Sequence, residues 1–206
     1  MWEHQIADFT GAGYRFIAYD RRAEGNALDD LEALADHLRL DKFHLLGTAA
    51  GGIVAVDYAL SHQEKLRSLV IANSIVGVQD EEYFELTRRL RPAPEFNAIP
   101  PEIRELGPAY RATNAEGTKR WKELAQHSTL QPTRNKITFA ALETIRTPTL
   151  LITGDADLYT PPPVLRLFAA RFPNGESLVI PECGHSAFWE QPEAFNRAVL
   201  DFISKH

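Results

Sequence analysis

The stretch HLLGTAAGG, residues 44–52, places a Gly-rich turn between two apolar segments of different character. Residues 43–46 form a short apolar run, which predicts a buried strand. Residues 50–60 are apolar on all sides, which predicts a mostly buried helix. A strand that passes through a sharp turn into a buried helix is typical of an α/β unit.

The rest of the chain continues this alternation of strand-like and helix-like segments. The expected strands are 14–19, 43–46, 66–73, 149–153 and 177–180. The expected helices are 27–38, 50–60, 164–172 and a last one that begins near Pro192. Apolar strands separated by helices predict an α/β fold, with a mostly parallel sheet covered by helices on both faces.

One long segment interrupts the alternation. Residues 79–147 are charged and contain several prolines, and they hold three expected helices, 80–90, 101–106 and 116–127, but no strand-like run. We therefore expect a core domain made of residues 1–78 and 148–206, with a helical insertion at 79–147.

Composition limits the classes of function. Of the 206 residues, 44% are hydrophobic and 24% are charged, as in ordinary globular proteins. The net charge of −6 argues against nucleic acid or an anionic membrane as a partner. No apolar run approaches the ~18 residues of a membrane span, and the start lacks a signal-peptide pattern. Cys183 is the single cysteine, which excludes a disulfide within the chain and a cysteine-rich zinc site.

These properties predict a cytoplasmic protein that acts on a small molecule without a metal or a cofactor. The Gly-rich turn lacks the Lys-Ser/Thr ending of a phosphate-binding loop. The sequence is also compatible with a homo-oligomer.

Three chemically suggestive sites follow expected strands. They are the turn at 47–51, the run Gly154-Asp155-Ala156-Asp157, and the run Gly184-His185-Ser186. Open α/β sheets place their ligands at the carboxyl ends of the strands, so we expect these sites to meet at one edge of the sheet.

Several segments resemble the α/β-hydrolase fold superfamily, in the subgroup with a helical cap. They are YDRR (19–22), HLLGTAAGGIVAVDYAL (44–60), TPTLLITGDADLYTPP (147–162) and IPECGHSAFWEQPEAFNRAVLDFI (180–203). The chain order of turn, acid and histidine is that of nucleophile, acid and base in this superfamily.

The resemblance assigns roles to individual residues. Ala49 stands at the nucleophile position, where the family has serine, and it carries no nucleophilic group. His185 would be the general base, and Asp157 would orient its ring. Asp155 is the competing acid, and Asp157 is favoured because the family places the acid three residues after the glycine. The N–H of Ala50 would be one oxyanion donor.

Other residues are candidates for the walls of a substrate pocket. Thr48, Trp121 and Phe188 are expected to contact the substrate, while most other aromatic residues of the insertion should pack in the core. Cys183, close to the histidine, is more simply explained as a small residue that fills space than as a nucleophile.

Two departures from the family pattern carry expectations. The family's oxyanion strand and loop should precede Trp2 and are absent, so we expect early strands to be missing, an exposed sheet edge near 14–19, and a natural start upstream of Met1. The loop DRRAEGNALDD, residues 20–30, is unusually short. Either Ala23 and Glu24 are not natural neighbours, or the loop is naturally short.

The sequence thus predicts a hydrolase of a small ester, lactone, thioester or C–C bond substrate bound between core and cap, in a form without its serine. The alanine would be either engineered or natural. One alternative is a non-catalytic ligand-binding protein on the same scaffold. Another is a hydrolase in which His185 and Asp157 activate water directly.

Overall fold

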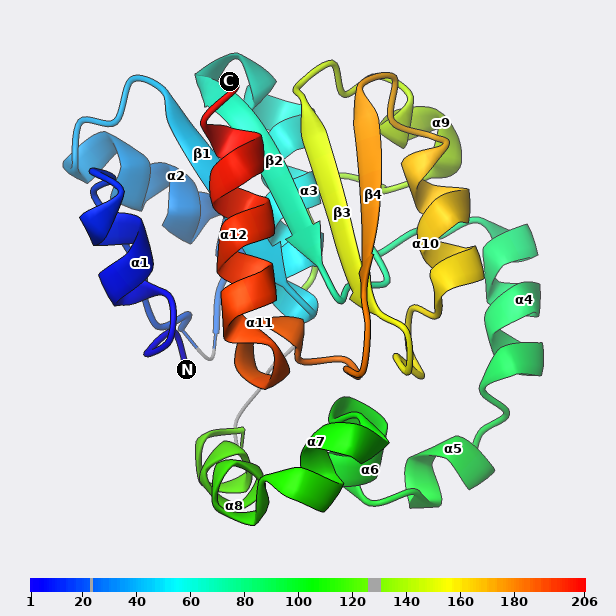
Figure 1. The fold of residues 1–206 in the computed structure, drawn as a ribbon. Coiled ribbons are helices and arrows are strands. Elements are labelled where there is room, and N and C mark those ends of the chain that lie inside the picture. Colours follow the sequence, from blue (N-terminus) through cyan, green and yellow to red (C-terminus); the bar gives the residue numbers. More distant parts are fainter. Residues whose placement is uncertain (23, 126–130) are drawn as a thin grey trace.

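The computed structural model describes residues 1–22, 24–125 and 131–206. Its sheet is built from β1 (Phe43–Thr48), β2 (Leu66–Ala72), β3 (Thr149–Gly154) and β4 (Gly175–Ile180). All neighbouring strands are parallel, in the order β1-β2-β3-β4 (Figure 1). The carboxyl ends of the four strands therefore lie at one edge of the sheet.

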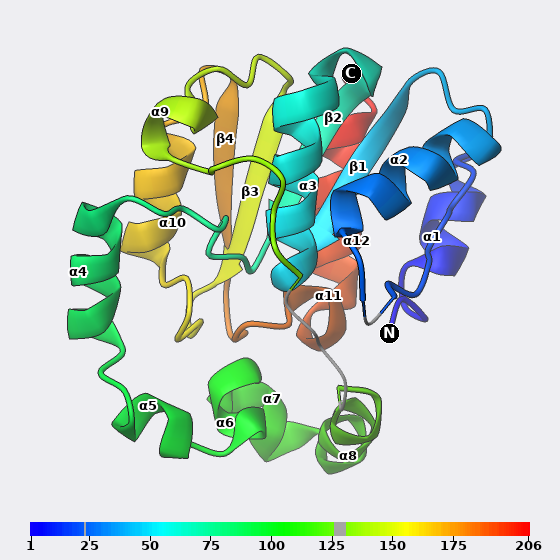
Figure 2. The same cartoon turned by 180° about the vertical axis from the view of Figure 1, so that it is seen from behind.

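Helices cover both faces of the sheet, as the apolar strands predicted. α2 (Ala27–His37), α3 (Ala50–His62) and α10 (Pro162–Ala169) lie on one face, and α12 (Pro192–Ile203) lies on the other (Figures 1 and 2). α1 (Ile6–Gly11) and α11 (Ala187–Glu190) accompany α12. Within β3, Leu151 belongs to the core under α3 and α10, while Leu150 and Ile152 belong to the core under α12. The alternation of side chains along each strand thus feeds two cores.

The segment between β2 and β3 contains the helices α4 (Glu81–Leu90), α5 (Glu95–Ala98), α6 (Pro101–Glu105), α7 (Pro108–Thr113), α8 (Ala115–Leu124) and α9 (Phe139–Leu142). α5 to α8 stand apart from the sheet, beyond the carboxyl ends of its strands (Figures 1 and 2). Phe139 and Leu142 of α9 are instead buried in the core with Phe168. The helix expected at 116–127 ends at Leu124, and His127 lies outside the described residues.

The expected strand at 14–19 is wrong, because residues 14–20 have no regular secondary structure. β1 pairs with β2 along one side only and forms the edge of the described sheet. A cleft of about 1850 Å³, lined by residues 14–22 and by β1, lies along the other side. A segment without a hydrogen-bonded neighbour cannot form a ladder. The described sheet thus contains no strand before β1, as expected.

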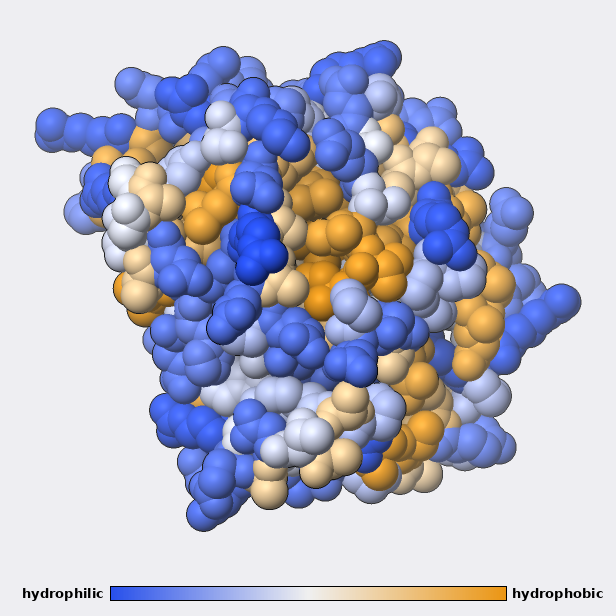
Figure 3. Space-filling model, viewed as in Figure 1, coloured by the Kyte–Doolittle hydropathy of each residue, from blue (hydrophilic) through white to orange (hydrophobic). Residues whose placement is uncertain are grey.

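Apolar side chains gather near the middle of the face seen in Figure 1, above the helices α5 to α8 (Figure 3). Among the described residues, no helix is long and apolar enough to cross a bilayer. The two alternatives for Ala23 and Glu24, a break in the natural chain or a naturally short loop, concern a position outside the described residues, because Ala23 is not described.

Candidate active site

The turn that joins β1 to α3 consists of Ala49 alone. β1 ends at Thr48 and α3 begins at Ala50, while Ala49 has φ 47° and ψ −119°. A positive φ is uncommon for a residue with a Cβ and persists only where neighbours hold it. The N–H of Ala49 donates to the carbonyl of Ala72 at 3.0 Å, and its own carbonyl accepts the Ser74 hydroxyl at 2.7 Å. Contacts to the end of β2 therefore fix the turn.

Glycines allow the close backbone contacts of this turn. A Cβ on Gly47 would lie 2.2 Å from the carbonyl oxygen of Gly51, and a Cβ on Gly52 would lie 2.6 Å from Ser74. A Cβ on Gly51 would meet nothing within 4 Å. There is thus no room for a side chain at Gly47 or Gly52, which explains two of the glycines in the run GTAAGG, residues 47–52.

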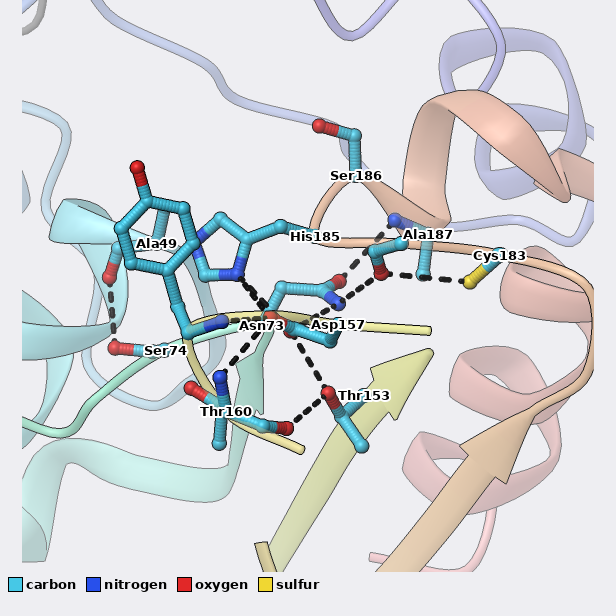
Figure 4. Close-up of polar contacts among 12 residues, drawn as sticks. Ala49, Asn73, Ser74, Thr153, Asp157, Thr160, Cys183, His185, Ser186 and Ala187 are labelled. Carbon is cyan, nitrogen blue, oxygen red and sulfur yellow. Dashed lines mark hydrogen bonds and ion pairs between the residues drawn. The ribbon is translucent and has the colours of Figure 1, made fainter. Parts of the chain in front are cut away.

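Asp157 follows β3 and is only 2% exposed. Burial acts to raise the pKa of its carboxyl, but the charge and hydrogen bond of His185 and further donors hold it well below its usual range. The carboxylate accepts five groups: His185 Nδ1–H (2.9 Å), the Thr153 hydroxyl (2.8 Å), the Asn73 amide (3.1 Å) and the N–H groups of Tyr159 (2.8 Å) and Thr160 (2.9 Å) (Figure 4). Asp157 is therefore ionised in a cage of donors.

The competing acid, Asp155, has a different role. It is exposed, and one of its carboxylate oxygens accepts the backbone N–H of Cys183 at 3.2 Å. The structure brings Asp157, and not Asp155, to the histidine.

His185 is 6% exposed, and its Nδ1 lies 2.9 Å from both carboxylate oxygens of Asp157. Burial acts to lower the pKa of this imidazole, but the charge of Asp157 and its hydrogen bond raise it overall. The ring centroid of Tyr159 lies 4.4 Å from that of His185. Because Nδ1 is bound to Asp157, Nε2 is the ring nitrogen available to a ligand. His185 and Ala49 line the same cleft.

Asn73 is a site residue that the sequence reasoning missed. It follows β2, has φ 47°, and is fully buried. Its amide donates to Asp157 and to the carbonyl of Gly184, both at 3.1 Å, and its oxygen accepts the N–H of Ala187 at 3.2 Å (Figure 4). Asn73 therefore joins the acid loop to the histidine loop. The sequence feature that could have identified Asn73 is its position: it is a polar residue at the end of β2, the strand whose carboxyl end was not among the three predicted sites.

Thr48, Trp121 and Phe188 all line the cleft that Ala49 and His185 line. The indole N–H of Trp121 donates to the Ser186 hydroxyl at 3.2 Å, which ties α8 to the histidine loop. The other Phe, Tyr and Trp residues described in the helical segment do not line this cleft; they are Tyr83, Phe84, Phe96, Tyr110 and Phe139.

Cys183 is fully buried beside the histidine loop. Burial raises the pKa of its thiol, and the carboxylates nearby act in the same direction. A protonated, inaccessible thiol is a poor nucleophile. In the part of the chain that the structure describes, no group of three or more His, Cys, Asp or Glu side chains is placed to hold a metal ion.

Comparisons with known proteins agree with this architecture. The 2-hydroxy-6-oxononadienedioate/2-hydroxy-6-oxononatrienedioate hydrolase of Comamonas testosteroni is 25% identical over 97% of this chain and 80% of its own length. The 2-hydroxy-6-oxo-6-phenylhexa-2,4-dienoate hydrolase of Burkholderia cepacia is 24% identical over the same shares. The crystal structure of the enol-lactonase from Burkholderia xenovorans LB400 has a TM-score of 0.79, with 18% identity over 98% of this chain and 85% of that one.

These relatives are hydrolases by name, and the solved structure shares the fold. The sequence profile described as the alpha/beta hydrolase family matches residues 1–198, which is nearly the whole chain. The chain belongs to the alpha/beta hydrolase family.

Proposed function

We propose that this chain is a hydrolase for a small ester, lactone, thioester or C–C bond substrate, in a form that lacks the serine nucleophile. One observation carries the proposal. His185 lines the same cleft as Ala49, the strained residue of a strand-to-helix turn, and its Nδ1 is bound by the buried carboxylate of Asp157. A nucleophile elbow needs this combination of an exposed tip and a base oriented by an acid.

The chemistry follows if a serine stands in place of Ala49. Its hydroxyl oxygen attacks the substrate carbonyl carbon while His185 Nε2 takes the hydroxyl proton, and Asp157 stabilises the imidazolium. His185 then gives the proton to the leaving group, and water hydrolyses the acyl intermediate. Ala50 begins α3, so its N–H has no acceptor within the helix and is available to the oxyanion. Such a donor is worth about 3–4 kcal/mol of transition-state stabilisation.

The helical segment supplies the other side of the proposed substrate site. We assign residues 79–147 the role of a cap, with α5 to α8 as the part that faces the carboxyl ends of the strands. Trp121 from this cap, with Thr48 and Phe188 from the core, would contact the substrate. The relatives' substrates, by their names, are unsaturated keto acids, which is compatible with a cleft of mixed apolar and polar character.

Two alternatives differ in what Ala49 means. If alanine is natural, the cleft would either bind a ligand without chemistry, or hold a water that His185 activates with Asp157. The intact pair favours the second of these over the first, because binding alone does not require it. The source gene across residues 47–51 distinguishes an engineered alanine from a natural one.

The proposal is tested with the variant Ala49→Ser in a chain that includes the oxyanion loop expected before Trp2, assayed against small activated aryl esters beside the same chain with Ala49. We expect hydrolysis by the variant well above background and loss of that gain in Ala49→Ser/His185→Ala. An inactive Ala49→Ser with native circular dichroism would refute the proposal. A parent that is as fast as the variant would instead favour the water mechanism.

A further inference from the structure

Glu190 is a buried carboxyl that the proposed chemistry does not use. It ends α11, is 5% exposed, and is absent from the lining of the cleft. Its Oε2 accepts the N–H of Gly107 at 2.6 Å, and its Oε1 accepts the N–H groups of Gly184 at 2.9 Å and Ser186 at 3.2 Å. One side chain thus contacts both neighbours of His185 and the helical segment.

The backbone of His185 itself is held from the same direction. Its N–H donates to the carbonyl of Glu105, at the end of α6, at 2.8 Å. Three consecutive N–H groups, those of residues 184–186, are therefore bound either by Glu190 or by a carbonyl of the helical segment. Any displacement of residues 105–107 must break bonds that fix the backbone of the histidine.

Two glycines bring these backbones into direct contact. A Cβ on Gly107 would lie 2.8 Å from the nitrogen of Gly184, and a Cβ on Gly184 would lie 2.5 Å from the nitrogen of Gly107. The contact has no room for side chains at either position. The helical segment and the histidine loop are therefore fitted to each other at this point.

Local helix capping does not account for the whole arrangement. The bond to Ser186 is local to α11, but Gly107 is 83 residues distant in sequence. Burial raises the pKa of Glu190 to about 7, against the opposing effect of its three backbone donors. A desolvated carboxyl is retained at a cost, which favours a role beyond finishing a four-residue helix.

We propose that Glu190 is a positioning residue, which clamps the histidine loop to residues 105–107 and thereby aligns His185 with Asp157. The inference rests on the proposed function, since it concerns the base of that site. These contacts link the position of the helical segment to the orientation of His185. His185 is therefore aligned with Asp157 only while residues 105–107 remain bound to the histidine loop.

The test is an NMR titration of His185 in the parent chain, in Glu190→Gln and in Glu193→Gln. Glu193 is exposed three residues further on, so it controls for the change of charge. In Glu190→Gln the side-chain NH2 group would face a backbone N–H, two donors that cannot bond to each other. The histidine loop would then be held less firmly, and the hydrogen bond between His185 and Asp157 would weaken. Since Asp157 raises the pKa of His185 and burial lowers it, we expect this pKa to fall by about one pH unit. Amide exchange at Gly107 and Gly184 should quicken about tenfold or more.

A purely structural Glu190 predicts a different result, in which the protein unfolds more easily but the pKa of His185 in the folded molecule is unchanged. That result would overturn the proposal, as would equal effects of Glu190→Gln and Glu193→Gln. If Glu190→Gln does not fold, Glu190→Asp keeps the charge and loses the reach to Gly107, with the same expected fall. These measurements involve no hydrolysis, so the two proposals can fail separately. If Ala49→Ser is inactive but Glu190→Gln lowers the pKa of His185, the proposed function is refuted and the role of Glu190 stands.

Discussion

Replacement of Asp157 by asparagine should destabilise the fold in a way that depends on pH. The carboxylate lies 2% exposed among five donors. Removing one partner of a buried ion pair costs about 3–5 kcal/mol. We expect Asp157→Asn to lose about this much of the free energy of unfolding at pH 5.5, where His185 is protonated.

The sign of the pH dependence follows from the two pKa directions. The pKa of His185 is raised in the folded state, so its contribution is complete below the unfolded value, about 6.5, and is lost as the pH rises through the folded pKa. The pKa of Asp157 is lowered, so its contribution is present above about 3.9 and is lost only as the pH falls through the folded value. The two contributions overlap between about pH 4 and 6.5. The stability lost by Asp157→Asn should therefore be larger at pH 5.5 than at pH 9. Each pH unit by which the pKa of His185 is raised adds about 1.4 kcal/mol to this difference in the free energy of unfolding.

The assay is urea unfolding at pH 5.5, 7 and 9, followed by tryptophan fluorescence. Asp155→Asn is the matched control, because Asp155 is exposed, lies two residues away and makes a single bond to Cys183. We expect it to cost about 1 kcal/mol or less at each pH. An Asp157→Asn variant that is no less stable than Asp155→Asn, or whose loss is the same at pH 5.5 and pH 9, would refute the reasoning.

Three further outcomes are expected. Gly47→Ala should prevent correct folding or cost well over 3 kcal/mol of the free energy of unfolding, because its Cβ would lie 2.2 Å from a carbonyl oxygen, whereas Gly51→Ala should be neutral or stabilising by up to about 1 kcal/mol. Thermal unfolding compares the two variants, and equal melting temperatures would contradict the geometry of the turn at 47–51. Asn73→Ala should cost about 3 kcal/mol of the free energy of unfolding, because it removes three buried hydrogen bonds, while exposed Asn174→Ala should cost about 1 kcal/mol or less; urea unfolding compares them, and equal losses would count against the place of Asn73 in the site. The Cys183 thiol should react with a thiol reagent only after unfolding, and rapid labelling of the native protein would contradict its burial.

The regular core was predictable because its signals are long. Strands β1 to β4 and helices α2, α3, α10 and α12 are apolar or amphipathic over enough residues for their period to be read. α1 and α11 contain six and four residues, too few for a period. The strand expected at 14–19 has strand-like composition, but a strand also needs a hydrogen-bonded partner, which sequence pattern does not reveal.

The site was predictable where a motif placed a residue at a strand end. The resemblance to the α/β-hydrolase superfamily implied the pairing of Asp157 with His185, and the carboxyl ends of parallel strands gave the edge of the sheet where the two would meet. Asn73 was missed because its role appears only when the strand order puts β2 between β1 and β3. Glu190 was missed because its partner, Gly107, lies in the helical segment, and no local pattern connects them.

The central claim is that turn, acid and histidine form one catalytic constellation in which Ala49 occupies the position of the nucleophile. It is tested most directly by mass spectrometry of Ala49→Ser after exposure to a serine-directed organophosphonate, beside the parent chain and Ala49→Ser/His185→Ala. The account predicts a covalent adduct on the new serine at position 49, which the parent cannot form there and which the double variant forms far more slowly. A folded Ala49→Ser that remains unlabelled at position 49, or that is labelled equally fast without His185, would contradict it.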